Sequence, residues 1–504
     1  MGKNKNKAKQ TDSEQSMQLP AQYANLPPEY QQQLMAQLNS VPTKQEIERR
    51  SRIYFANMKR ANQQVSKADI SQVQSWFGDN WFGELTKKVR ETYIFSQDQT
   101  ATVAIQRIIP VEQVIKILEL GTKLLSNSLN VENIIVPGTP ITELQSDLPK
   151  QYKDKLPADF GLQSLQQMKP VELQYNTPQI PKHPHLIIVG DTHGTFEVLE
   201  NVFAKEGLPA DDIVYLFNGD YVDRGSFSIE IFISLLVFKL LNNKCMYMLR
   251  GNHETASVSS MYSLQEEVKR KYPDHHEQIF QLFVKCFQAL PIAARINDSY
   301  YVVHGGISGW PGFDIDMINT LNRFRDPESQ QSSHYQSFDP LSDVLWSDPS
   351  EDLEKIRFNQ TRGTAIQFGK TAIKAFLKSS KMQFLIRSHT CVPEGYQLMH
   401  DAHTMTLFSV PNYNEKNLGA YCVLYGLYDA EKQPNDLQRR SLKDCSAKAL
   451  YEIEPAVPLC FIRQFNCSDH AKIINQPIIR EMQERQMQAQ QAQIFEMLRR
   501  QGAM

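Results

Sequence analysis

Six short apolar runs in the chain each end in a cluster of glycine and polar residues. In order, the clusters read GDTHG, NGDYVDRG, RGNHE, HGG, RSH and SVPNY, and they follow residues 186–189, 213–217, 246–249, 300–303, 384–386 and 404–408. Runs of this length and composition favour buried β-strands. Because ligand sites in such sheets gather where the strands end, the clusters together predict one common site.

The donors in these clusters are of the types that hold two metal ions. They are carboxylates, imidazoles and one amide: Asp191, His193, Asp220, Asn252, His304 and His389. This mixture suits borderline ions such as Mn²⁺, Fe²⁺ or Zn²⁺, whereas oxygen-only sets suit Mg²⁺ or Ca²⁺. A single carboxylate such as Asp220 can bridge two cations, and the pair can hold a hydroxide while drawing charge from a phosphoryl group. The pattern therefore predicts phosphate ester hydrolysis at a dinuclear site.

The elements that position these residues follow an alternating pattern. After residue 184, short runs rich in Val, Ile, Leu and Tyr alternate with helical segments, which predicts an α/β domain of layered sheets and helices. The apolar stretch Ile231 to Leu241 is expected to be a buried helix. Ahead of these runs, Pro110 opens another helix, in which apolar residues from Val111 to Leu125 recur at three- and four-residue spacing.

Composition excludes several classes of protein. The 504 residues contain 54 Lys or Arg and 56 Asp or Glu, so the formal charge is -2 and no nucleic-acid partner is expected. The stretch 231–241 is well short of the roughly 20 apolar residues that cross a bilayer, so no membrane span is expected either. The start MGKNKNKAKQ lacks the apolar segment of a secretory signal. The seven cysteines form no CxxC pair, which favours reduced thiols and a cytoplasmic or nuclear location.

The sequence divides into five expected segments. Residues 1–44 are expected to be a disordered polar tail, because they are rich in Gln, Asn and Lys. A helical N-terminal region, 45–135, includes the helix that leads into the catalytic domain. Eight prolines between Asn133 and Pro184 mark 136–184 as a connector or insertion. The catalytic domain is expected at 185–465, and a C-terminal tail with a helix at 466–504.

At its polar clusters the sequence resembles the phosphoprotein phosphatase family of metal-dependent Ser/Thr phosphatases. The motifs GDTHG, GDYVDRG, RGNHE, HGG, WSDP (346–349), TRG (361–363) and PNY (411–413) carry the resemblance, which spans about Val111 to Asp429. Within the family, GDYVDRGSFSIE and RGNHET are most similar to the type-5 catalytic domain. The resemblance implies a metallophosphoesterase-like central β-sandwich flanked by helices, with a mainly helical N-terminal extension.

The resemblance also implies a role for each matched residue. The first ion would be held by Asp191, His193 and Asp220, and the second by Asp220, Asn252, His304 and His389. His253 would be the general acid toward the leaving oxygen, oriented by Asp223. Arg224 and Arg362 would grip the phosphate, with Asn252 and Tyr413 completing its cradle. A hydroxide bridging the ions would attack in line, without a phosphoenzyme.

Two positions depart from the family pattern. Asn414 follows PNY where the family commonly has Cys or Leu, which puts sensitivity to natural toxins in doubt. Thr390 follows His389 where the type-5 pattern has Glu, which changes the support of that histidine.

Three functions stay open at this point. The first is a protein Ser/Thr phosphatase acting on phosphoprotein substrates, with the N-terminal part of the chain supplying targeting, autoinhibition or a docking site for a regulatory protein. The second is a related metallophosphoesterase that acts on nucleotides, although Arg362 within TRG and Tyr413 within PNY weigh against it. The third is a scaffold that keeps the fold with weak activity, against which the intact ligand set argues.

Overall fold

A computed structural model gives the structure of the protein. It describes residues 65–95, 101–103, 106–136, 138–140, 171–172, 184–327, 339–414, 416–428 and 457–466. The expected tail at 1–44, most of the connector and residues 467–504 lie outside the described residues.

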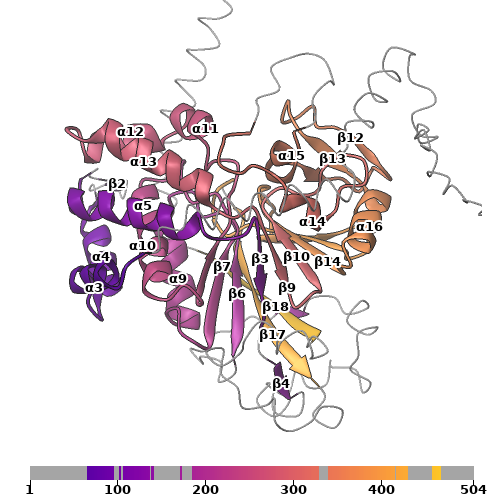
Figure 1. The fold of residues 1–504 in the computed structure, drawn as a ribbon, viewed down its shortest axis with the longest axis horizontal. Helices are drawn as coiled ribbons and strands as arrows, with labels where there is room; N and C mark the ends of the chain where they lie inside the picture. The colour runs from indigo at the N-terminus through magenta and orange to yellow at the C-terminus, as the bar shows by residue number, and fades with distance from the viewer. Residues whose placement is uncertain are drawn as a thin grey trace, which may run out of the picture.

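Two large β-sheets form the centre of the molecule (Figure 1). The seven-stranded sheet has the order β5 (Val171–Glu172), β18 (Val457–Phe465), β17 (Gly419–Tyr428), β6 (His185–Val189), β7 (Ile213–Phe217) and β8 (Met246–Met248), with β4 (Gly138–Pro140) paired to β17. The six-stranded sheet has the order β15 (Tyr396–Met399), β16 (Thr404–Leu407), β14 (Phe384–Arg387), β10 (Tyr300–Val303), β9 (Ala293–Ile296) and β3 (Val131–Ile134).

The central strands bury both of their faces. In β6, Leu186 and Ile188 belong to the cluster between the two sheets, where they share a core with Val302 and Ile386. Ile187, the residue between them, belongs instead to the cluster under the helices. Successive side chains of a strand point to opposite faces, so a strand such as β6, with four successive apolar residues, needs a covering layer on each side. This is why the strands are continuous apolar runs in the sequence.

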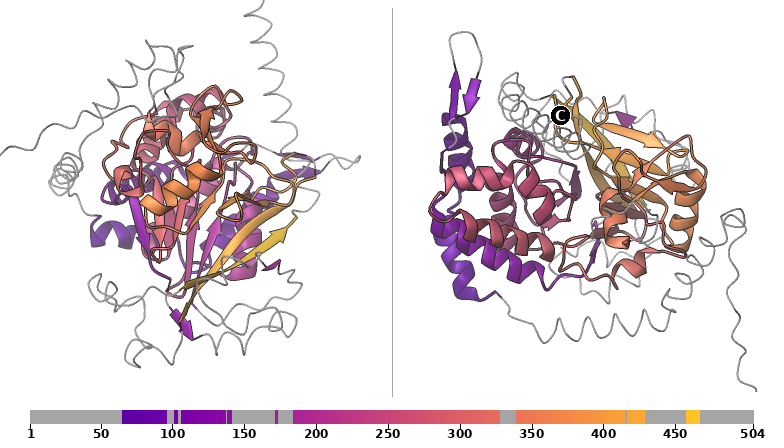
Figure 2. Two further views of the ribbon diagram at one scale, coloured as in Figure 1. Left: turned by 90° about the vertical axis from the view of Figure 1, so that its right-hand side faces the viewer. Right: turned by 90° about the horizontal axis from the view of Figure 1, so that it is seen from above.

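Helices cover both outer faces of the sandwich (Figures 1 and 2). The larger layer lies beside the seven-stranded sheet and contains α3 (Lys67–Trp76), α4 (Trp81–Glu91), α5 (Val111–Leu125), α9 (Phe196–Glu206), α10 (Ser228–Leu241), α11 (Ala256–Met261), α12 (Leu264–Lys271) and α13 (His276–Ala289). The opposite layer contains α14 (Ile315–Ile318), α15 (Pro340–Trp346), α16 (Lys370–Ser379) and a three-stranded sheet of β11 (Asp348–Pro349), β13 (Ile366–Phe368) and β12 (Ile356–Phe358). The hairpin of β1 (Tyr93–Phe95) and β2 (Ala101–Val103) stands away from the rest (Figure 2).

The predicted fold class is confirmed. Each of the six predicted strands is present with bounds within one residue, as β6, β7, β8, β10, β14 and β16. The helix predicted from Val111 is α5, and the apolar stretch predicted to be a buried helix forms most of α10, which is buried from Ser228 to Leu240. The strands could be predicted because each is a short, mostly apolar run that ends in a polar cluster, and α5 because its apolar residues recur at helical spacing.

The helices ahead of the connector belong to the same core as the catalytic motifs. Val73 of α3 and Phe82 of α4 lie in the cluster that also contains β6 and β7. The Phe82 ring lies 5.7 Å from that of Phe196 and 5.1 Å from that of Phe203. Among the described residues, no helix has the length and apolar character to span a bilayer.

Candidate active site

The predicted ligands lie on loops that leave the carboxyl ends of the central strands. Three of them have backbone conformations that non-glycine residues seldom adopt, with φ of +39° at His193, +52° at Asp220 and +71° at His389. Such residues carry a conformational cost and persist only where surrounding structure holds them, which is typical of active sites. The surrounding structure therefore holds these three side chains in place despite the strain in their backbone.

Glycines let two of these loops approach each other closely. A Cβ atom added to Gly251 would lie 2.3 Å from the Oδ1 atom of Asp220. Gly219, with φ of +88°, passes so close that an added Cβ would lie 2.5 Å from the Gly251 nitrogen. Only glycine fits at such close approaches, so the GD and GNH sequences are needed to place Asp220 beside Asn252.

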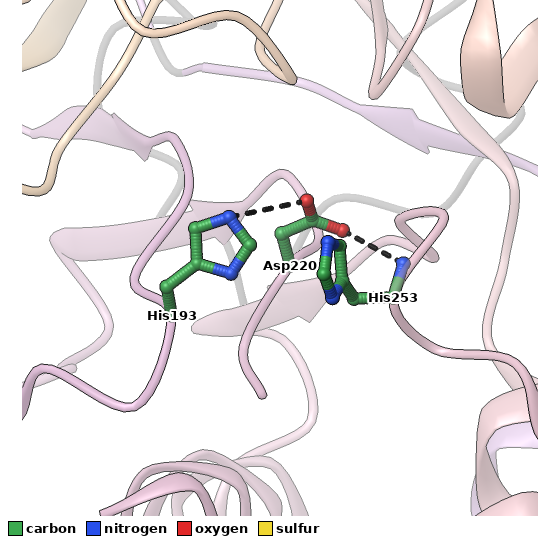
Figure 3. Close-up of side chains that lie close together, drawn as sticks. All are labelled: His193, Asp220 and His253. Carbon is green, nitrogen blue, oxygen red and sulfur yellow. Dashed lines mark hydrogen bonds and ion pairs between the residues drawn. The ribbon is translucent and has the colours of Figure 1, made fainter. Parts of the chain in front are cut away.

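The Asp220 carboxylate lies between two sets of histidines. Its Oδ2 atom is 3.5 Å from Nε2 of His193, and its Oδ1 atom is 3.3 Å from Nε2 of His304. The close-up shows the first of these contacts, together with the His253 backbone N–H that donates to Oδ1 over 3.0 Å (Figure 3). In the described structure, Asp220 shares one group of possible metal-binding atoms with His193 and His253 and a second group with His304 and His389.

Asp191 joins the two groups from the side of β6. Its carboxylate oxygens lie 3.7 Å from Nε2 of His193 and 3.9 Å from Nδ1 of His304. It also accepts the backbone N–H of His389 over 3.1 Å. Asp191 is thus next to both histidine sets, although the group of possible metal-binding atoms around His193 contains His253 and not Asp191.

Backbone carbonyls fix which imidazole nitrogen faces the centre. Nδ1 of His193 lies 3.1 Å from the carbonyl oxygen of Val222, and Nδ1 of His304 lies 2.8 Å from that of Asn218. A carbonyl only accepts, so Nδ1 carries the proton in each case and Nε2 is left for a ligand. Nε2 of His389 is buried and has no hydrogen-bond partner among the described residues, which is the state expected of a metal ligand.

The surroundings of His304 indicate a place for a cation. Its Nε2 atom faces the Oδ1 of Asn252 at 2.9 Å as well as the Asp220 carboxylate. With Nδ1 already donating, Nε2 must either carry a second proton or share a cation with these two oxygens. Burial lowers the pKa of His304, but the Asp220 carboxylate outweighs burial and raises this pKa to about 9. The donors therefore fit a metal ion.

The buried carboxylates indicate the same need for positive charge. Burial and the neighbouring Asp220 raise the pKa of Asp191 to about 7. Burial would also raise the pKa of Asp220, but His304 and His253 lower it well below its ordinary value. Burial lowers the pKa of His193 to about 3, so this imidazole stays neutral and able to bind a metal. Bound cations would offset the electrostatic repulsion between the Asp191 and Asp220 carboxylates.

His253 and Asp223 form a separate pair beside these donors. Nδ1 of His253 lies 2.7 Å from the Oδ2 atom of Asp223. Burial opposes a charge on His253, but Asp220 and Asp223 raise its pKa above the ordinary value. A raised pKa favours the protonated imidazole, which is the state that a proton donor needs.

The two arginines predicted to grip phosphate are both near the site. Arg362 donates from Nε to Asp348 over 2.9 Å and from Nη2 to the His389 carbonyl over 3.1 Å. The guanidinium carbon of Arg224 lies 4.3 Å from the ring centre of Tyr262 and 5.9 Å from that of Tyr413. Tyr413 also stacks on His193, with ring centres 5.5 Å apart.

Three supporting residues were missed in the sequence. Glu254 is fully buried and accepts the backbone N–H groups of Asp220 and Tyr221, each over 2.8 Å. Asp348 accepts from Arg362, Arg387 and Thr390. Glu254 and Asp348 lie inside the RGNHE and WSDP motifs, so the motifs contained a signal. Tyr262 lies outside the quoted motifs, and no local pattern indicates its contact.

Comparisons with known proteins agree with this geometry. Residues 184–393 match the family described as calcineurin-like phosphoesterase. The chain is 38% identical over 287 residues to serine/threonine-protein phosphatase 5 of Rattus norvegicus, covering 56% of this chain and 55% of that protein. It is 34% identical over 311 residues to serine/threonine-protein phosphatase T of Schizosaccharomyces pombe, covering 58% and 63%. A solved Saccharomyces cerevisiae protein serine/threonine phosphatase, described as similar to human phosphatase PP5, aligns with a TM-score of 0.51 at 25% identity, covering 71% of this chain and 91% of that one.

These matches define the class of the central domain. Residues 184–393 have the fold of the calcineurin-like phosphoesterases that they match. The resemblance to the phosphoprotein phosphatases, and among them to the type-5 enzymes, is confirmed. The chain spans a little over half the length of the curated relatives it matches, from 55% to 63% for the two named here.

Proposed function

We propose that the protein is a serine/threonine phosphatase that hydrolyses phosphoserine and phosphothreonine esters in phosphoprotein substrates at a dinuclear metal site. The observation that carries the proposal is the position of Asp220, whose two carboxylate oxygens face separate histidine sets at 3.5 and 3.3 Å. A single carboxylate placed in this way can bridge two cations. The relatives named phosphatase 5 and phosphatase T support the same activity.

The proposed ligand sets follow the donors described above. Asp191, His193 and Asp220 would hold one ion, and Asp220, Asn252, His304 and His389 the other. Imidazole and carboxylate donors suit Mn²⁺, Fe²⁺ or Zn²⁺. When bound, such ions supply Lewis acidity toward a phosphoryl oxygen and lower the pKa of water.

The remaining residues of the site would bind the substrate and move one proton. Arg224 and Arg362 present planar forks of N–H donors, which match phosphate oxygens better than a point charge does. His253 would give its proton to the departing Ser or Thr oxygen, and the 2.7 Å contact with Asp223 orients the ring for that transfer. Asn252 and Tyr413 would complete the phosphate cradle.

Two alternatives remain to be separated from this proposal. A nucleotide-directed phosphoesterase would use the same ions but hydrolyse dinucleoside polyphosphates. A weakly active scaffold would keep the fold without turnover, and the intact ligand set argues against it.

The proposal also includes regulation or targeting through the N-terminal part of the chain. It further includes a cytoplasmic or nuclear location.

The test is phosphate release from a phosphothreonine peptide by the full chain, with and without added Mn²⁺. We expect metal-dependent release, and we expect the Asp220→Asn protein to lose at least about three orders of magnitude in kcat. Circular dichroism of the variant should match the wild-type chain. Hydrolysis of a dinucleoside polyphosphate but not of the peptide would favour the second function, and release of phosphate from neither would favour the scaffold.

Regulation by the N-terminal part of the chain needs a separate test with a shortened chain. Deletion through residue 100 would remove Val73, Phe82 and Leu85 from the core, so a loss of activity would reflect unfolding. A chain that starts at residue 65 keeps α3 and α4. Faster turnover by this truncated chain would support autoinhibition, and an unchanged rate and KM would oppose it.

A further inference from the structure

The geometry points to Tyr262 as the positioning residue of Arg224. The face of the Tyr262 ring would hold the Arg224 guanidinium in place to bind the phosphate group of a monoester substrate. This inference rests on the proposed function, because it assigns Arg224 to substrate phosphate. The guanidinium carbon lies 4.3 Å from the ring centre of Tyr262, which is within the range of a cation–π contact.

The charge on Arg224 lacks a carboxylate partner within the described part of the chain. No ion pair of this residue occurs there, and its Nε atom is buried without a hydrogen-bond partner. A buried donor left unpaired costs free energy unless a ligand completes it. Its φ of +74° adds conformational strain. The guanidinium of Arg224 is therefore not held by a hydrogen bond from Nε. Its described contacts are the rings of Tyr262 and Tyr413.

Backbone hydrogen bonds fix Tyr262 opposite Arg224. The Oδ1 atom of Asp223 accepts the N–H groups of Ser263 over 3.0 Å and of Leu264 over 2.8 Å. These donors directly follow Tyr262, and Asp223 directly precedes Arg224. The Asp223 carboxylate thus ties the segment that follows Tyr262 to the residue before Arg224, while its other oxygen contacts His253.

The Tyr262 ring also contacts the proposed proton donor. Its centre lies 4.9 Å from that of His253. The ring therefore lies next to both the guanidinium and the imidazole. A carboxylate in its place would neutralise Arg224 and compete with phosphate for its donors. An aromatic face orients the cation and leaves its N–H groups for the substrate.

The experiment measures binding of inorganic phosphate to the Mn²⁺-loaded full chain by calorimetry, alongside kcat and KM for the phosphothreonine peptide. We expect Tyr262→Leu to weaken phosphate binding and raise KM by roughly 3- to 30-fold. Tyr262→Phe keeps the ring and should restore most of the affinity. In the Arg224→Ala background, Tyr262→Leu should have little further effect, because the cation that faces the ring is already gone.

A matched control is available outside the site. Tyr247 lies under Lys239, whose Nζ atom is 5.1 Å from the ring centre, so Tyr247→Leu removes a similar contact without touching Arg224. Its phosphate affinity should equal that of the wild type. Equal affinity in Tyr262→Leu, or failure of Tyr262→Phe to restore it, would overturn the inference, as would a wild-type chain that binds no phosphate.

The two proposals fail in different ways. If the chain hydrolyses the peptide but its phosphate affinity and KM do not depend on Tyr262, the proposed function stands and the inference fails. If phosphate affinity depends on Tyr262 but the chain hydrolyses no phosphopeptide, the inference stands and the proposed function fails.

Discussion

Arg362 and Arg224 reach the same site but are held in opposite ways. Arg362 is fixed by the Asp348 carboxylate, 2.9 Å from its Nε, and by the carbonyl of His389. Arg224 is fixed by the ring of Tyr262. A carboxylate gives strong directional bonds but cancels part of the charge, whereas an aromatic face does neither. The comparison suggests a division of roles. Arg362 is fixed next to His389 by its bonds to Asp348 and to the His389 carbonyl, whereas Arg224 retains more of its charge for phosphate.

The strongest way to break this comparison is to remove the charge of Asp348. Asp348→Asn leaves Arg387, which is fully buried, and Arg362 without their shared carboxylate. Breaking such a pair typically costs about 3 to 5 kcal/mol, so we expect the free energy of unfolding in urea to fall by about 3 kcal/mol or more. Turnover should fall as well, because Arg362 loses its anchor. A stability equal to that of the wild type would show that the arginines do not depend on this charge.

A second aspartate shows what a buried carboxylate does with neutral partners. Asp343 accepts from the Ser308 hydroxyl over 2.6 Å and the Gly309 N–H over 3.0 Å. Burial raises its pKa from 3.8 to about 7, whereas burial of Asp348 is outweighed by His389, Arg387 and Arg362, so its pKa lies far below the ordinary value.

The raised pKa of Asp343 predicts a pH dependence of stability. Between pH 4 and 7 the folded chain binds a proton at Asp343 that the unfolded chain does not, so this stabilisation is complete below about pH 4 and is lost as pH rises through 7. From pH 5 to pH 8 we expect this group to remove about 2 to 3 kcal/mol. Urea unfolding at both pH values should show that Asp343→Asn lacks this part of the slope. An identical slope in the variant would contradict the prediction.

Replacing each arginine with lysine sharpens the comparison. Lysine keeps the charge but loses the planar fork. We expect both Arg224→Lys and Arg362→Lys to lower kcat/KM about 10- to 100-fold. Their stabilities should differ, because only Arg362→Lys loses bonds to Asp348 and His389, with an expected cost of about 1 to 2 kcal/mol. Urea unfolding and peptide kinetics on the same preparations test this, and equal stability losses in the two variants would refute the proposed division of roles.

The strands and the predicted ligands could be found in the sequence because each is a local feature. The run Leu186–Val189 is apolar throughout, and Asp191 and His193 follow it within four residues. The contact of Tyr262 with Arg224 could not be found in this way. It depends on backbone bonds from Ser263 and Leu264 to Asp223, about forty residues earlier, and such pairings exist only once the loops are packed.

The packing of α3 and α4 shows the same limit. Both fall within the helical region predicted at 45–135, but nothing local shows that Phe82 lies against Phe196 and Phe203. The aromatic contact joins segments more than one hundred residues apart. Helical propensity is a local property, whereas the face that a helix buries is decided by the layer it meets.

The smallest effect is expected at Thr390, where the chain departs from the type-5 pattern. Its hydroxyl accepts from Nη1 of Arg387 over 2.6 Å and donates to Oδ1 of Asp348 over 2.9 Å, so it adds a neutral bridge to an ion pair. Thr390→Val keeps the shape and removes this bridge, which should cost about 1 kcal/mol in urea unfolding. Thr390→Ser keeps the hydroxyl and should lose less. Because Asp348 still holds Arg362 directly, kcat/KM should change by less than about 5-fold, and a larger loss would mean that the hydroxyl, not the carboxylate, sets the position of Arg362.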